Sequence, residues 1–141
     1  MGDRKRKMIL ILCAVLLIAA VLGCFRYRSE IDRIYTESTH QDVIRLTASK
    51  PEIGNTRVIS AFYDRETEQY QFRVRLTGPN TGLWPFNGEH PVLEVNGQTI
   101  EAYSTIPDTL WFWKDYVLLF DGELADGTRM TVGTDSCVFS E

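Results

Sequence analysis

Histidine and cysteine are scarce in this chain of 141 residues, which contains 2 His and 3 Cys. Cys137 is the only cysteine beyond residue 25, so no disulfide can form within that part of the chain. We expect Cys137 to be a buried strand residue, because neither His40 nor His90 lies near it in the sequence to activate a thiol. Phosphate-loop, HExxH, CxxC and GxSxG motifs are also missing. These absences argue against an enzyme, and we expect no metal and no cofactor.

Positive charge is scarce outside the N-terminus. The chain has 15 Lys and Arg against 19 Asp and Glu, a net charge of −4. The first 25 residues hold four of the positive charges, at residues 4 to 7, and one of the negative charges, Asp3. The other residues therefore carry 11 positive and 18 negative charges. This part of the chain, which we call the body, is acidic and has no basic patch. That argues against a nucleic-acid partner, because Lys and Arg supply most affinity for phosphates.

Residues 8–25, MILILCAVLLIAAVLGCF, form an apolar run without a charge. At about 1.5 Å per residue the run is roughly 27 Å long, close to the thickness of a hydrocarbon core. Four basic residues precede it, and Arg26 and Arg28 follow it. The positive-inside rule then predicts a cytoplasmic N-terminus and a body outside the cytoplasm. The run is either an uncleaved signal anchor or a cleaved signal peptide.

Cys24 is a candidate for lipidation. The residues Val21-Leu22-Gly23-Cys24 partly resemble a bacterial lipobox, although Leu22 stands where a small residue is preferred. The length of the apolar run favours a single-pass anchor, with a lipoprotein as the alternative. In both cases residues 1–25 are a basic tail and a signal segment, and the protein is tethered to the cell membrane.

Residues 26–40 predict a stalk or a short helix. Ile31, Ile34 and Tyr35 are spaced i, i+3, i+4 with charges between them, and Ser and Thr gather near residues 36–39, where the helix is expected to end.

From residue 41 to residue 141 the pattern is typical of short strands. Residues 57–63 and 70–76 predict one hairpin, and Asn96-Gly97 predicts the turn of another. Pro107 is expected to interrupt the segment 104–109. About seven to eight strands, with turns every 8–12 residues or so, favour an all-β antiparallel sandwich. The layout resembles small immunoglobulin-like domains of bacterial surfaces, and a small β-barrel is the alternative.

Aromatic residues are the most suggestive candidates for a binding site. Trp84 and Phe86 lie in a long loop, and three more stand in a row at Trp111, Phe112 and Trp113. Neighbours in a strand face opposite sides, so these three cannot all point inward. Either the loop packs on them as a small core, or an aromatic patch is exposed for binding.

The acidic residues offer weaker candidates. Asp121, Glu123 and Asp126 could supply oxygens to calcium, but Asp-Gly turns explain them better. Surface positions on strands or loops likewise explain Glu89, Glu94 and Glu101 better than acid–base catalysis does.

The sequence is compatible with three functions. The first is a membrane-tethered, non-catalytic binding or assembly module of the bacterial cell envelope that contacts a protein partner. The second is a cell-wall glycan-binding domain that uses exposed Trp residues. The third, a small hydrolase, has the least support.

Overall fold

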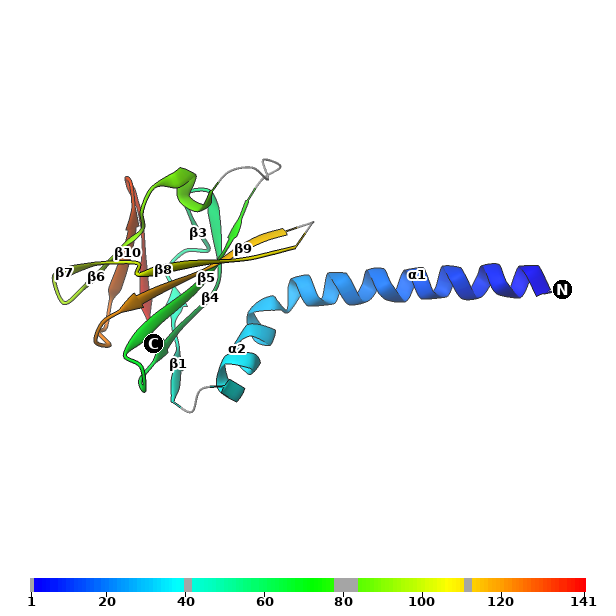
Figure 1. Ribbon diagram of the computed structural model, residues 1–141, viewed down its shortest axis with the longest axis horizontal. Helices are drawn as coiled ribbons and strands as arrows, with labels where there is room; N and C mark the ends of the chain where they lie inside the picture. Colours follow the sequence, from blue (N-terminus) through cyan, green and yellow to red (C-terminus); the bar gives the residue numbers. More distant parts are fainter. Residues whose placement is uncertain (1, 40–41, 78–83, 111–112) are drawn as a thin grey trace.

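The computed structural model describes residues 2–39, 42–77, 84–110 and 113–141. Two helices, α1 (Gly2–Arg26) and α2 (Arg28–Thr39), precede a body of strands (Figure 1). The strands are β1 (Val43–Arg45), β2 (Thr47–Ala48), β3 (Glu52–Ile53), β4 (Thr56–Asp64), β5 (Gln69–Leu76), β6 (Val92–Val95), β7 (Gln98–Glu101), β8 (Ser104–Leu110), β9 (Trp113–Asp121), β10 (Thr128–Val132) and β11 (Asp135–Ser140). A 3-10 turn, η1 (Pro85–Gly88), lies before β6.

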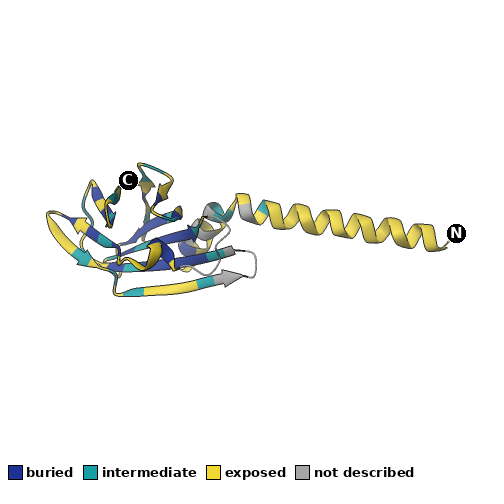
Figure 2. Cartoon of the chain, turned by 90° about the horizontal axis from the view of Figure 1, so that it is seen from above, coloured by how far each residue is buried: buried dark blue, intermediate teal, exposed yellow. Residues whose placement is uncertain are grey.

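Helix α1 extends away from the strands, and its residues 2–22 are exposed (Figure 2). An 18-residue window within its segment Gly2–Cys24 has a mean hydropathy of 2.7, and no residue of that window is buried. By length and composition this helix can cross a membrane, as a membrane anchor or as a signal sequence.

The strands form two antiparallel sheets. This confirms the prediction of an antiparallel β fold for residues 41–141. The first sheet has the order β1-β4-β5-β9-β8, with β3 added to β4. The second sheet has the order β2-β11-β10-β6-β7. Two separate sheets are the arrangement of a sandwich and differ from a closed barrel.

Both predicted hairpins are present. Strands β4 and β5 pair through a register that includes Ala61 opposite Phe72. Strands β6 and β7 are joined by Asn96 and Gly97, whose φ angles are 50° and 77°. Positive φ at both turn residues is the geometry that Asn-Gly favours, and it matches the twist of the two strands.

The expected interruption at Pro107 is wrong. Strand β8 runs through this residue, and Pro107 pairs with Tyr116 of β9. Strand β8 lies at the edge of the first sheet. Proline has no N–H to donate, and an edge strand tolerates this loss because one of its sides has no partner strand.

The main core lies between the two sheets. Phe72 of β5 is fully buried, and its ring centroid is 5.7 Å from that of Phe120 on β9 and 4.7 Å from that of Phe139 on β11. Cys137 is also buried in this core, with its Sγ 3.6 Å from Ser49 Oγ. The prediction that Cys137 is a buried strand residue is therefore confirmed.

Helix α2 covers part of the outer face of the first sheet. It contacts β1 and β4, and its Thr36 is buried. Phe62 of β4 and Val117 of β9 are buried as well, although neither belongs to the main core. The helix ends as predicted, where Ser38 and Thr39 hydroxyls donate to the carbonyl of Tyr35 at 2.7 Å and 3.0 Å. Ser and Thr hydroxyls that donate to a carbonyl of the preceding turn are local side-chain-to-backbone bonds, and here they lie in the last turn of the helix.

Candidate functional site

A cleft of about 330 Å³ lies beside η1 and is the first candidate for a binding site. The buried side chains of Phe86 and Leu118 contribute to its lining, together with the exposed residues Trp84, Glu89 and His90. An apolar cleft with a few polar groups beside it is typical of a binding site.

The backbone of η1 is locally strained. Phe86 and Asn87 have φ angles of 59° and 56°, in the left-handed region. Asn tolerates this region, whereas Phe adopts it rarely. Burial of the Phe86 ring against the core compensates for that conformation, because a fully buried Phe contributes roughly 1.5–3 kcal/mol.

Trp84 is the most open aromatic residue of the cleft. Its side chain is 65% exposed, and its ring centroid lies 6.1 Å from the ring of the buried Tyr116. Asn55 Nδ2 donates to the Trp84 carbonyl at 3.1 Å, which fixes the backbone at this position. The indole is therefore exposed to solvent, and the hydrogen bond from Asn55 holds the backbone from which it extends.

The aromatic residues of the predicted patch differ in their exposure to solvent. Phe86 is buried and Trp84 is exposed. Trp113 is the first residue of β9 and its Cα pairs with Leu110. Trp111 and Phe112 lie outside the described residues. The described part of the predicted patch thus contains one exposed ring, Trp84, beside one buried ring, Phe86.

The predicted carboxylates are dispersed. Glu94 on β6 and Glu101 on β7 are exposed, and the carboxylate of Glu89 lies against Gly133. Cys24 is exposed within the last turns of α1. Among the described residues no group of three or more His, Cys, Asp or Glu side chains could hold a metal ion.

A second feature, which the sequence did not predict, is a cluster of charged residues on the outer face of the first sheet. Asp115 of β9 has a fully buried side chain. Arg75 of β5 donates two hydrogen bonds to this carboxylate, from Nε to Oδ1 at 2.6 Å and from Nη2 to Oδ2 at 3.1 Å. This two-bond geometry is the strongest form of an Arg–carboxylate pair.

Helix α2 joins this cluster through Arg28, its first residue. Arg28 Nη2 donates to Asp108 Oδ2 of β8 at 2.8 Å, and its Nε lies 3.6 Å from Asp115 Oδ2. Arg73 of β5 also donates to Asp108 and lies 3.8 Å from Asp115. We call these five residues the Arg–Asp cluster. It connects α2 to strands β5, β8 and β9.

The cluster affects the protonation of Asp108. The hydrogen bond from Arg73 lowers the pKa of this carboxyl below its usual value, and the charges of Arg73 and Arg28 lower the pKa further against the opposing effect of burial. Asp108 therefore stays ionised to lower pH in the folded protein than in the unfolded chain.

No motif in the sequence indicated this cluster. Arg73 and Arg75 alternate with the core residues Phe72 and Val74, which is the pattern of a solvent-facing side of a strand. In the folded chain both are buried, within a cluster that Arg28 of α2 joins. Two outward Arg residues on one strand were the single available signal.

The chain matches no protein-family model, and no curated protein or solved structure is significantly similar to it. The interpretation of both features therefore depends on the chemistry of this chain alone.

We expect Asp115→Asn to destabilise the fold by about 3–5 kcal/mol, because the change leaves buried guanidinium groups without their counter-charge. The matched control is Asp121→Asn on the same strand, where the carboxylate is exposed and accepts a bond from Gln69. That variant should change stability by about 1 kcal/mol or less. Urea denaturation followed by circular dichroism measures both, and equal losses would refute the role of Asp115.

The lowered pKa of Asp108 predicts a dependence of stability on pH. Because the folded-state pKa lies below the unfolded value, the ionised carboxylate stabilises the fold above about pH 4, and this contribution disappears as the pH falls through the folded-state pKa. Asp108→Asn should therefore be less stable than the wild type at neutral pH, and the difference should shrink in acid. A difference that stays constant from neutral pH to about pH 2 would contradict this assignment.

Proposed function

We propose that this protein is a membrane-tethered, non-catalytic binding or assembly module of the bacterial cell envelope. In this proposal α1 is a single-pass signal anchor, and an immunoglobulin-like sandwich lies outside the cytoplasm. The cleft beside η1 then contacts a protein partner. The observation that carries the binding role is the exposed and supported Trp84 at that cleft.

The properties of α1 support the tether. Its apolar run, residues 8–25, would span roughly 27 Å at about 1.5 Å per residue, which is close to the thickness of a bilayer core. Within the described part of the chain no residue of its apolar window is buried, so its apolar surface needs another apolar environment. The four basic residues at positions 4–7 favour a cytoplasmic N-terminus. Lipidation at Cys24 is the alternative means of attachment.

The cleft supports contact with a protein. Tryptophan is enriched among the residues that contribute most to protein interfaces, because its large ring buries much area with few rotatable bonds. The strained backbone at Phe86 and Asn87 also supports a binding role, because such strain gathers at functional sites.

A glycan is the second candidate ligand, and the surroundings of Trp84 favour it specifically. The exposed indole offers a flat face for stacking on a sugar ring. His90 and Glu89 are exposed beside the same cleft and could hydrogen-bond to hydroxyl groups.

A photo-crosslinking amino acid at His90 tests the proposed contact in intact cells. We expect a discrete crosslinked product from the full chain, and we expect Trp84→Ala to remove it, because loss of a central Trp weakens an interface by about 2 kcal/mol or more. Mass spectrometry of the product distinguishes a protein from a cell-wall glycan.

The control position is Arg129, which is exposed on β10 of the second sheet. A crosslinker there should not give the same product. The binding role would be wrong if the His90 product persisted without Trp84, if both positions gave it equally, or if His90 crosslinked only within its own chain.

A further inference from the structure

Four large side chains are exposed to solvent along one face of α2 and at its junction with α1. Tyr27, Ile31, Ile34 and Tyr35 are 58%, 40%, 58% and 67% exposed. Their spacing of i, i+4, i+7 and i+8 places them along one side of a helix. We call this face the apolar stripe.

Among the described side chains of α2, those that pack on the sandwich are polar. Thr36 is buried there, and Arg28 forms its ion pairs with Asp108 and Asp115. Glu30 accepts a hydrogen bond from Arg45 of β1 at 3.0 Å. Surface helices of soluble domains normally turn their apolar side toward the core. Helix α2 has the opposite orientation, which indicates an apolar environment on its outer side.

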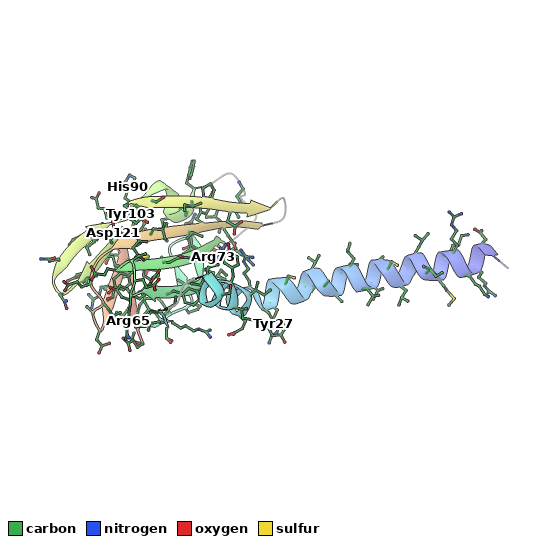
Figure 3. The ribbon with its side chains drawn as sticks, turned by 60° about the horizontal axis from the view of Figure 1, so that its bottom comes forward. Tyr27, Arg65, Arg73, His90, Tyr103 and Asp121 are labelled. Carbon is green, nitrogen blue, oxygen red and sulfur yellow. The ribbon has the colours of Figure 1, made fainter. Side chains whose placement is uncertain are left out.

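The apolar stripe is continuous with α1. Tyr27 N donates to the carbonyl of Gly23, and Ile31 N donates to the carbonyl of Tyr27, both at 2.9 Å. Tyr27 therefore lies at the junction of the two helices (Figure 3), one residue after α1 ends. Helix α2 then bends away from the axis of α1 (Figure 1). The stripe thus starts where a membrane-crossing α1 would leave the bilayer.

The composition of the stripe also suits a membrane surface. Tyrosine is enriched where membrane and water meet, because its ring is apolar and its hydroxyl can remain hydrated. Here a tyrosine lies at each end of the stripe, with two isoleucines between them. Amphipathic helices with such a face lie in the bilayer surface with the apolar side at the boundary of headgroups and acyl chains.

We propose that the apolar stripe lies in the interfacial region of the same bilayer that α1 crosses. Helix α2 is then an interfacial helix, with lipid on its apolar side and the first sheet on its polar side. This inference rests on the membrane tether of the proposed function. Because the Arg–Asp cluster joins α2 to the sheet, the sandwich would be held in one orientation on the membrane.

The test places a genetically encoded fluorescent amino acid at Tyr35 of the full chain. The protein is reconstituted in phosphatidylcholine vesicles whose lipids carry a nitroxide near the headgroup end of an acyl chain. The matched position is Tyr103, which is 53% exposed and lies far from Tyr27 on the sandwich (Figure 3). We expect the nitroxide to quench most of the fluorescence at Tyr35 and to leave Tyr103 unchanged.

Flotation of the same vesicles separates this inference from the tether. Protein that fails to float with lipid would overturn the tether and the inference together. Protein that floats, with Tyr35 as unquenched as Tyr103, would overturn the inference alone. Self-quenching at Tyr35 that rises with the protein-to-lipid ratio, without quenching by lipid, would assign the stripe to a second copy of the chain and also overturn it.

A pair of variants tests the role of the apolar side chains. Combined Ile31→Ser and Ile34→Ser should preserve flotation, because α1 is unchanged, and should remove much of the quenching at Tyr35. Ile106→Ser is the matched control, since Ile106 is an exposed isoleucine of β8 outside the stripe. Quenching at Tyr35 that survives the double change, or that falls equally in the control, would contradict the inference.

Discussion

Asp115 is a carboxylate with no solvent exposure, and the position of α2 follows from the cations that surround it. A buried charge is tolerated only when it is paired and hydrogen-bonded. Arg75 supplies the two-bond partner from the neighbouring strand, and Arg28 supplies a charge from the helix. The same Arg28 reaches Asp108 of the edge strand. One ionic cluster thereby fixes the first turn of α2 against three strands.

Several features follow from this attachment. Helix α2 contacts β4 on the outer face of the first sheet, where Phe62 is buried outside the main core. Because its polar side is used for docking, its apolar side is left exposed. Because α2 follows α1 directly, the cluster also connects the sandwich to the apolar helix. The proposed tether, the interfacial helix and a defined orientation of the Trp84 cleft all depend on this geometry.

The sequence predicted what is determined locally. The alternation around Phe72 and the Asn96-Gly97 turn specify their hairpins without distant contacts, and the spacing of Ile31, Ile34 and Tyr35 specifies a helix. Contacts between distant segments could not be predicted. Pro107 fits within β8 because that strand is at an edge, and Arg73 and Arg75 are buried in an ionic cluster that includes Arg28 of the distant helix α2. The spacing of apolar residues likewise predicted an apolar and a polar face of α2. It did not predict which face packs on the sheet. The loop pattern identified Trp84 and Phe86 as candidates but did not indicate that one would be exposed and the other buried.

We expect Arg28 and Asp115 to be energetically coupled, although one belongs to α2 and the other to β9. A double-mutant cycle with Arg28→Met, Asp115→Asn and the combined variant measures this coupling in the free energy of unfolding of the full chain. We expect a coupling of about 1 kcal/mol or more, with Arg28→Met less harmful once Asp115 has lost its charge. Additive effects, within about 0.3 kcal/mol, would show that the cluster does not hold the helix to the sheet.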